Sequence, residues 1–358
     1  MDILSPINHI SEVGLLREAG ATELYCGLMR PEILREFTNV FSLNSRHVSE
    51  ANLPGFKELK ELAAAARAAG MKVFVTYNAM YPEQQFGALT DEVARTLECG
   101  IDGLIVADVA LMQHLRERHP ETNVIVSTLG GAFNSRSCRM YGELGASRIT
   151  LPRPLTVGEI SAVAAACPDM EFEVFIMSER CFFPNALCNF EHATYRVRGG
   201  LLPTAAEVAR RLLGHRMSAF TGTYSNRLVN RLQDRFIARN GMMCCREYDA
   251  ELLDSEGRTL ESGLTFRFMD VWNSFREACG LCSLYDIVGI SNARSVKVVG
   301  RQSLTSKKCA EVSMIRRALD LLEEKPARED FERAVKDIRK ETYPLYCGDA
   351  YCYYNELK

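Results

Sequence analysis

The sequence lacks the motifs of common hydrolases and of nucleotide-binding enzymes. It has no H-E-x-x-H and no G-x-S-x-G pattern, so neither a zinc protease nor a nucleophile-elbow hydrolase is indicated. No glycine-rich phosphate turn follows the first expected strand, which disfavours an open, doubly wound sheet. The six histidines show no paired spacing typical of a metal site. The sequence therefore offers no recognisable apparatus for hydrolysis.

The chain also lacks a strong excess of charge and any long apolar run. Its 358 residues carry a formal net charge of -3, which argues against a strongly basic nucleic-acid-binding shell, although a local arginine patch leaves RNA open as a partner. No segment approaches the length of a membrane span, and the opening residues do not resemble a secretory signal. We therefore expect a cytoplasmic protein with no membrane span. Its thirteen cysteines are expected to be reduced.

Short β-rich runs alternate with helical patterns, which is the rhythm of repeated βα units around a parallel sheet. Two of the helical stretches end in Gly70 and Gly100, as helix C-caps do. Eight strands with intervening helices predict an α/β fold of the TIM type, a (β/α)8-like barrel with an inserted helical subdomain. The expected strands are residues 2–4, 22–26, 72–77, 103–106, 123–127, 148–151, 171–176 and 295–299.

An arginine-rich helical region breaks this rhythm in the second half of the chain. We interpret it as an insert over the barrel mouth, serving either as a solvated helical pair or as a partner-binding lid. The predicted organisation is a first part of the barrel over 1–192, the insert over 193–240, barrel completion over 241–310, and C-terminal helices with an aromatic tail over 311–358.

The cysteines gather in three places in the second half of the chain. Soft metals and iron-sulfur clusters take thiolates from several chain segments, so this clustering makes a metal centre the first hypothesis for function. Adjacent cysteines do not easily bind one metal ion together, so only one of that pair is expected to be a ligand. The C-x-x-C spacing suits zinc, an iron-sulfur cluster or a redox disulfide. The clusters are Cys181 with Cys188, Cys244 with Cys245, and Cys279 with Cys282.

The segment EFEVFIMSERCFFPNALC, residues 171–188, resembles peptidase family U-32, in which a strand with E-x-F precedes two cysteines at this spacing. Further similarity lies in KVFVTYNAMY, in the text from NVIVSTLGG to LTVGEI, in MMCCREY and in CGLCSLYDIVGISNARSVKVVGR. The family's H-G after E-x-F is replaced around Met177 and Ser178.

The resemblance implies a TIM-like barrel that holds a 4Fe-4S cluster. Carried over by motif, the ligands are Cys181, Cys188, Cys245 and Cys282. Cys244 is the alternative to Cys245, and Cys279 is the alternative to Cys282. Family members include collagenase-like peptidases as well as anaerobic hydroxylases of ubiquinone synthesis and of RNA. The hydroxylases are thought to take oxygen from prephenate.

Polar residues just past the barrel strands are the candidate catalytic groups, because strand ends of a barrel converge on one face. Asn78 is expected to orient substrate and Asp108 to act as an acid or base, although buried caps and turn bonds explain each of them nearly as well. Lys297 and Arg301 suit a dicarboxylate such as prephenate, with pairing to Glu173 as the structural alternative. Arg153 follows another expected strand.

The favoured function is an oxygen-independent hydroxylase or related redox enzyme that acts on a small aromatic or quinone precursor or on an RNA base. The alternatives are a collagenase-like protease and a non-catalytic, cluster-bearing subunit of a heterodimer with a family-related partner. In that last case the aromatic tail with Tyr351, Tyr353 and Tyr354 is expected at the interface.

Overall fold

The computed structural model describes most of the first half of the chain and most of its last eighty residues. The described residues are 1–30, 32, 43–46, 51–180, 248–253, 256–266, 277–344, 347–348 and 351–354. The chain divides into two compact units, of which the first comprises Met1–Cys188 with Glu277–Lys358 and the second comprises Asn189–Arg276. The expected helical insert at 193–240 lies outside the described residues.

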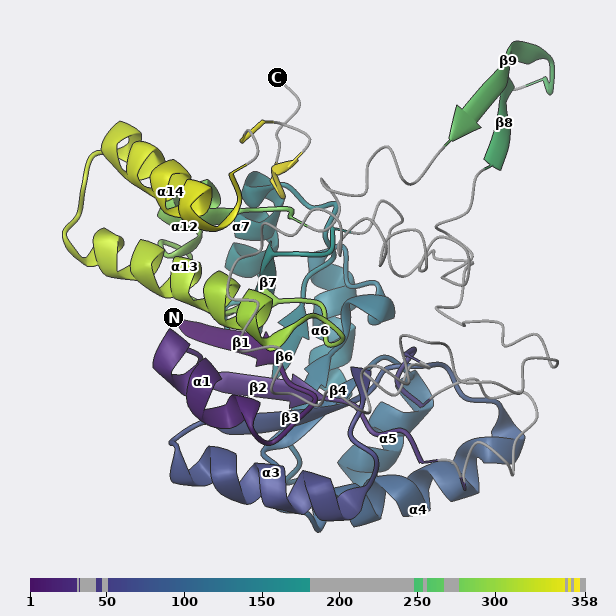
Figure 1. The fold of residues 1–358 in the computed structure, drawn as a ribbon. Helices are drawn as coiled ribbons and strands as arrows, with labels where there is room; N and C mark the ends of the chain where they lie inside the picture. The colour runs from purple at the N-terminus through teal and green to yellow at the C-terminus, as the bar shows by residue number, and fades with distance from the viewer. Residues whose placement is uncertain are drawn as a thin grey trace, which may run out of the picture. The chain divides into compact units, whose positions relative to one another are not determined.

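The first unit is a closed barrel of eight parallel strands, which confirms the predicted fold and excludes the open sheet (Figure 1). Around the barrel the strands follow the order β1-β10-β7-β6-β5-β4-β3-β2, so that β10 closes the sheet between β1 and β7. The strands are β1 (Asp2–Pro6), β2 (Glu23–Cys26), β3 (Lys72–Tyr77), β4 (Gly103–Val106), β5 (Val124–Val126), β6 (Arg148–Thr150), β7 (Glu171–Met177) and β10 (Ala293–Val298).

Helices follow the strands of the barrel and pack on its outside. Gly70 and Gly100 have φ values of +70° and +75°, so both glycines end their helices in the left-handed conformation that the sequence predicted. The helices are α1 (Glu12–Ala19), α3 (Phe56–Ala68), α4 (Phe86–Leu97), α5 (Val109–Arg118), α6 (Ser135–Glu143), α7 (Val157–Ala166), α12 (Leu284–Ile287), α13 (Thr305–Glu323) and α14 (Arg328–Thr342). None of the helices described is long and apolar enough to cross a membrane.

The second unit contributes one described element, the antiparallel pair β8 (Tyr248–Leu253) and β9 (Thr259–Phe266). Its strands lie within the range that we expected to complete the barrel. The barrel strand of that range is β10 alone among the residues described.

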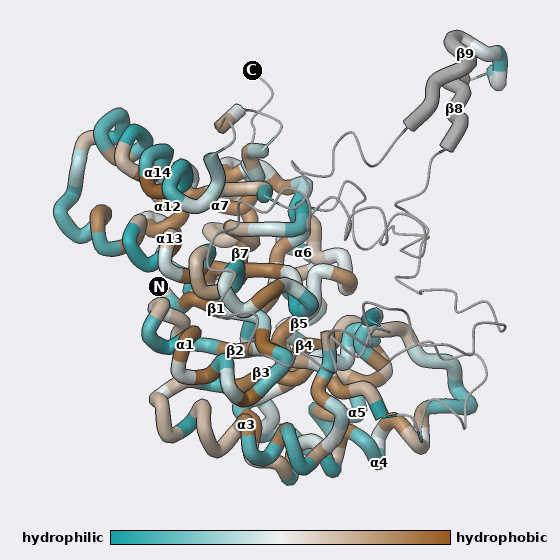
Figure 2. Tube along the Cα trace, in the orientation of Figure 1, coloured by the Kyte–Doolittle hydropathy of each residue, from teal (hydrophilic) through white to brown (hydrophobic). Residues whose placement is uncertain are grey.

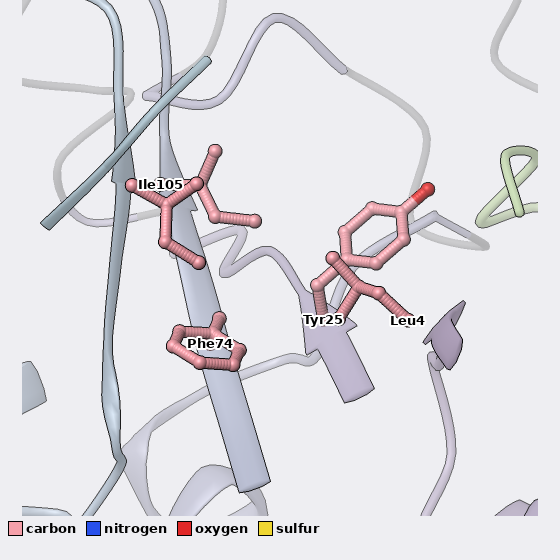
Figure 3. Packing of buried hydrophobic residues seen from close by; sticks show 5 residues of the cluster. Leu4, Tyr25, Phe74 and Ile105 are labelled. Carbon is pink, nitrogen blue, oxygen red and sulfur yellow. The ribbon is translucent and has the colours of Figure 1, made fainter. Parts of the chain in front are cut away.

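Alternate residues of the strands fill the barrel with apolar side chains. Leu4, Tyr25, Phe74, Ile105 and Ile125 come from β1 to β5 and form one buried cluster (Figure 3). The strands are accordingly hydrophobic along much of their length, whereas the outer helices carry hydrophilic stretches (Figure 2). Burial of this apolar layer supplies the main driving force for closing the barrel.

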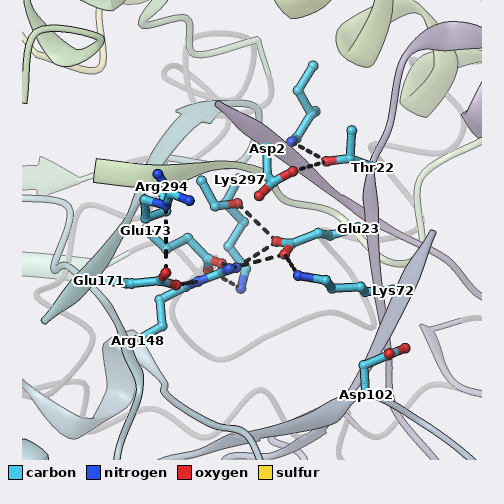
Figure 4. A network of polar contacts seen from close by, with 12 residues as sticks. Asp2, Thr22, Glu23, Lys72, Asp102, Arg148, Glu171, Glu173, Arg294 and Lys297 are labelled. Atoms are coloured by element: carbon cyan, nitrogen blue, oxygen red, sulfur yellow. Dashed lines mark hydrogen bonds and ion pairs between the residues drawn. The ribbon is translucent and has the colours of Figure 1, made fainter. Parts of the chain in front are cut away.

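A buried network of charges also lies in the barrel interior, with Lys297 and Arg148 over the rings of Tyr25 and Phe74 (Figure 4). Arg148 on β6 binds both carboxylate oxygens of Glu23 on β2, at 2.6 and 3.1 Å. Its guanidinium also lies 3.7 Å from Glu173 on β7, whose other oxygen accepts a 2.7 Å bond from Lys297 on β10. Burial raises the pKa of Glu23, and Arg148 limits the rise. The network thus joins four strands across the barrel through paired charges.

Replacing Arg148 by methionine is expected to lower the free energy of unfolding by about 3–5 kcal/mol, because the Glu23 carboxylate is left buried without its counter-ion. The loss should be smaller at low pH than at high pH. Without Arg148 the folded pKa of Glu23 rises further, so protonation of Glu23 favours folding at low pH, and this contribution is lost as pH rises through the folded pKa. Urea unfolding at several pH values measures both effects.

The matched control is Arg317→Met. Arg317 also binds both oxygens of a glutamate, Glu341, but this pair is on the surface with side chains 46% and 59% exposed. Its loss is expected to cost less than about 1 kcal/mol. Equal losses in the two variants would contradict the assigned role of the buried pair.

Candidate active site at the carboxyl end of the barrel

The chain leaves β7 through a strained turn. Ser178 and Glu179 have φ values of +68° and +30°, a region that residues other than glycine rarely adopt. Three contacts hold Ser178: its backbone N–H donates to Ala278, its carbonyl accepts from the Tyr353 hydroxyl at 2.5 Å, and Lys307 donates to its hydroxyl. Such strain persists only where the surroundings fix it. The contacts to Ala278, Tyr353 and Lys307 therefore fix the turn that follows β7.

Residues 277–283 run beside the end of β7. The Gly280 N–H donates to the Ile176 carbonyl at 2.8 Å, and Cys279 bridges to Met177. A short 3-10 helix, Leu281–Ser283, then carries Cys282. The C-x-x-C segment is consequently fixed by backbone hydrogen bonds next to the point where the chain continues toward Cys181.

The C-terminal tail pairs with the same segment from its other side. Cys279 and Cys352 are partners in a parallel bridge, with bonds of 2.7 Å from the Cys279 N–H to Tyr351 and 2.9 Å from the Tyr353 N–H to Cys279. The Tyr354 hydroxyl donates to the Phe175 carbonyl at 2.6 Å. Tyr353 and Tyr354 are thereby buried within their own chain. Neither ring is exposed in the way that the expected interface with a partner subunit would need.

The tail brings two further thiols, Cys347 and Cys352, near the C-x-x-C segment. Burial raises the pKa of Cys279 to about 12 and that of Cys282 to about 11, and the Cys347 thiol adds to both shifts. Among the described residues, no three histidine, cysteine, aspartate or glutamate side chains are arranged to hold a metal ion. The sequence contained the tail cysteines, but no local pattern linked them to residues about seventy positions earlier.

Of the four expected cluster ligands, the structure describes Cys282, a half-buried residue. Its alternative, Cys279, is buried. The other expected ligands and the remaining alternative lie outside the described residues: Cys181, Cys188, Cys245 and Cys244. The ligand set as a whole therefore remains a prediction.

Arg301 is buried and hydrogen-bonded to neutral groups. Its Nη1 donates to Thr76 at 3.0 Å and to Asn52 at 3.4 Å, and its Nη2 donates to the carbonyl and side-chain oxygens of Asn44, both at 3.1 Å. Burial lowers the pKa of Arg301 to about 10. Gly27, just past β2, makes room for this arrangement, because a Cβ there would overlap Arg301 Nη1 and the side chains of Asn52 and Asn44. Arg301 thus joins the loop after β2 to strand β3.

Lys297 adopts the structural alternative that the sequence left open, because its Nζ binds Glu173 inside the barrel. Burial lowers the pKa of Lys297, and the nearby charges of Arg148 and Arg153 lower it further. The Glu173 carboxylate opposes this effect and stabilises the charged form. A role in catalysis remains a prediction for Lys297 and Arg301.

Asp108 and Asn78 lie at neighbouring strand ends. Asp108 caps α5 by accepting from the Leu111 N–H at 2.9 Å, and its second oxygen accepts from the Tyr81 N–H at 3.3 Å. Asn78 donates to the Ser127 hydroxyl at 3.2 Å, and its Oδ1 is buried without a hydrogen-bond partner among the described residues. Asp108 is therefore held by backbone amides, whereas Asn78 keeps an acceptor available for a ligand.

Gly27→Ala is expected to destabilise the protein by about 1–3 kcal/mol, because the added methyl group displaces Arg301 from its neutral acceptors. Gly14→Ala provides the control: nothing lies within 4 Å of a Cβ at this helical glycine, so stability should stay the same or rise by up to about 1 kcal/mol. Thermal and urea unfolding test the pair. If Gly27→Ala were as stable as Gly14→Ala, the close contact with Arg301 would be refuted.

Comparison with known proteins places this site in a family. The profile of peptidase family U32 matches residues 9–200. The tRNA hydroxylation protein P of Helicobacter pylori (strain J99 / ATCC 700824) is 26% identical over 188 residues, which are 52% of this chain and 42% of that protein. The Escherichia coli (strain K12) protein of the same name is 26% identical over 187 residues, which are 52% of this chain and 38% of that protein.

A third relative is the 23S rRNA 5-hydroxycytidine C2501 synthase of Escherichia coli (strain K12), 26% identical over 199 residues that make up 54% of this chain and 27% of that protein. The chain thus spans less than half the length of these three relatives. The solved U32 peptidase Mk0906 is similar with a TM-score of 0.40 and 15% identity, covering 52% of this chain and 73% of that one. The family profile covers more than half of the chain, and the chain belongs to peptidase family U32.

Proposed function

We propose that this protein is an oxygen-independent hydroxylase that acts on a base in RNA. The observation that carries the proposal is the match to tRNA hydroxylation protein P and to the 23S rRNA 5-hydroxycytidine synthase, over about half of this chain. The family profile, over residues 9–200, contains barrel strands β2 to β7 and the strand ends that carry Asn78 and Asp108. A small aromatic or quinone precursor is the second candidate substrate.

The proposal includes a 4Fe-4S cluster held by Cys181, Cys188, Cys245 and Cys282. Two observations on this chain fit such a group. The backbone bonds between the end of β7 and residues 277–283 bring the Cys282 segment beside the chain that leads to Cys181, and Cys282 is half-buried and not engaged in a disulfide. When bound, a cluster of this kind supplies one-electron redox chemistry.

The barrel's own polar groups would then bind and orient the reactants. The buried Asn78 Oδ1 is available to accept a hydrogen bond from a substrate N–H, and Asp108 is held in place by two backbone amides. Prephenate, a dicarboxylate, is the proposed oxygen donor. Adding oxygen to a C–H bond is a two-electron oxidation of the base, so the reaction also consumes an electron acceptor.

Proteolysis finds less support in the site. Ser178 is buried and its hydroxyl accepts a hydrogen bond from Lys307, which is itself paired with Glu311. A serine nucleophile needs an accessible hydroxyl and a free base beside it. This serine and lysine therefore serve the turn after β7 rather than a nucleophilic mechanism.

Cys188→Ser is expected to lose the bound iron and sulfide and the visible absorbance of the anaerobically purified protein, because a four-thiolate cluster loses a ligand. Cys309→Ser is the matched control, since Cys309 lies half-buried on α13 and outside the proposed ligand set. Iron and sulfide analysis measures the result. Full cluster content in Cys188→Ser would remove this residue from the ligand set.

Deleting the gene is expected to abolish one hydroxylated nucleoside in tRNA or ribosomal RNA of the host, seen by mass spectrometry of nucleosides as the loss of a species one oxygen atom heavier than its parent. The wild-type gene and Cys309→Ser should restore it, and Cys188→Ser should not. An unchanged nucleoside profile in the deletion strain, grown without oxygen, would refute the assignment to RNA.

A further inference from the structure

Arg301 and Arg153, at the carboxyl end of the barrel, form no ion pair with a described carboxylate, and they differ in how their donors are used. Arg301 directs both of its terminal nitrogens to neutral oxygens of its own chain. Arg153, three residues past β6, has a buried Nε with no hydrogen-bond partner in the described part of the chain. No described carboxylate lies within ion-pair distance of Arg153 either. Within the described residues its charge therefore has no carboxylate partner, and its Nε donor is unused.

The surroundings of Arg153 hold its guanidinium in a fixed plane. The group stacks over the Phe175 ring with its central carbon 4.0 Å from the ring centroid. Tyr353 lies beside it, with its ring stacked on Phe175 at 6.5 Å and its hydroxyl donating to Ser178. Phe175 and Tyr353 are both buried. Stacking fixes the orientation of the five-donor fork before a ligand arrives, which reduces the entropy lost on binding.

The charges around Arg153 do not neutralise it. On the barrel side, Lys297 is a like charge whose own partner is Glu173, and Arg148 is bound to Glu23. On the tail side, the Tyr353 side chain is hydrogen-bonded to Arg153, and Tyr353 and Tyr354 are phenols whose pKa values burial raises, so both stay neutral. A half-buried cation without a counter-ion is costly, and an anion that accepts its hydrogen bonds relieves that cost.

We propose that Arg153, stacked on Phe175 beside the C-terminal tail, is the receptor for one oxyanion of the substrates, a carboxylate or a phosphate. The site lies at the strand ends where barrel enzymes bind their ligands. The planar guanidinium matches two oxygens of such a group at once. The inference deepens the proposed function by naming a binding group, and it rests on that function only for the identity of the ligand.

The test measures binding to the full chain purified without iron, so that its outcome is independent of hydroxylation. Isothermal titration calorimetry with phenylacetate and with inorganic phosphate distinguishes a small organic acid from a phosphate as the source of the oxyanion. Arg153→Met is expected to weaken the tighter of the two probes by about tenfold or more, the usual loss for a charge-assisted pair of hydrogen bonds. Arg153→Lys should weaken it less, because it keeps the charge and loses the fork.

Arg294→Gln is the matched control, because it removes an arginine charge at the start of β10. Arg294 is 59% exposed and pairs with Glu171, so this variant should bind both probes as the wild type does. Circular dichroism checks the fold of each variant. If Arg153→Met does not fold, Arg153→Lys decides alone. The proposal is overturned if neither probe binds the wild type at millimolar concentration, or if the folded Arg153 variants bind as tightly as the wild type.

Discussion

The backbone pairing around Cys279 is the constraint on which the carboxyl end of this barrel depends. This one residue joins the end of β7 to the C-terminal tail, through its bridges to Met177 and Cys352. The pairing fixes the position of the C-x-x-C segment and buries two tail tyrosines against β7. It also holds the left-handed turn at Ser178, because the Tyr353 hydroxyl binds the Ser178 carbonyl. Residues from three distant parts of the sequence therefore share one rigid frame.

The barrel interior combines an apolar cluster with a buried charged network, and each places a different demand on the sequence. The apolar cluster around Phe74 tolerates other residues of similar volume. The charged network tolerates far less, because Glu23, Arg148, Glu173 and Lys297 neutralise one another across four strands. Removing one member leaves another without its counter-ion in a place that water does not reach. Which residue is tolerated at one of these four positions therefore depends on the charges at the other three.

The fold could be predicted from the sequence because its signals are local: the hydrophobic period of each segment, the length of each segment and the glycines that end helices. All eight barrel strands overlap the β-rich segments that alternate with helical patterns in the sequence. Gly70 and Gly100 end helices as expected. The site was harder to predict because its contacts are not local. That Lys297 pairs with Glu173 depends on β10 lying next to β7, and the need for glycine at position 27 depends on Arg301, which follows 274 positions later. The tail cysteines likewise gave no signal until the chain was folded.

The closing of the barrel has a consequence for its synthesis. β1 pairs with β2 on one side and with β10 on the other, although β10 begins at Ala293. During translation β10 is made after the other seven barrel strands, so until then the edges of β1 and β7 both lack the strand that pairs with them. Unpaired strand edges are prone to association with other chains. The strand that prevents this is the last of the eight to be made, and a chaperone that shields β1 and β7 would protect the nascent chain during that interval.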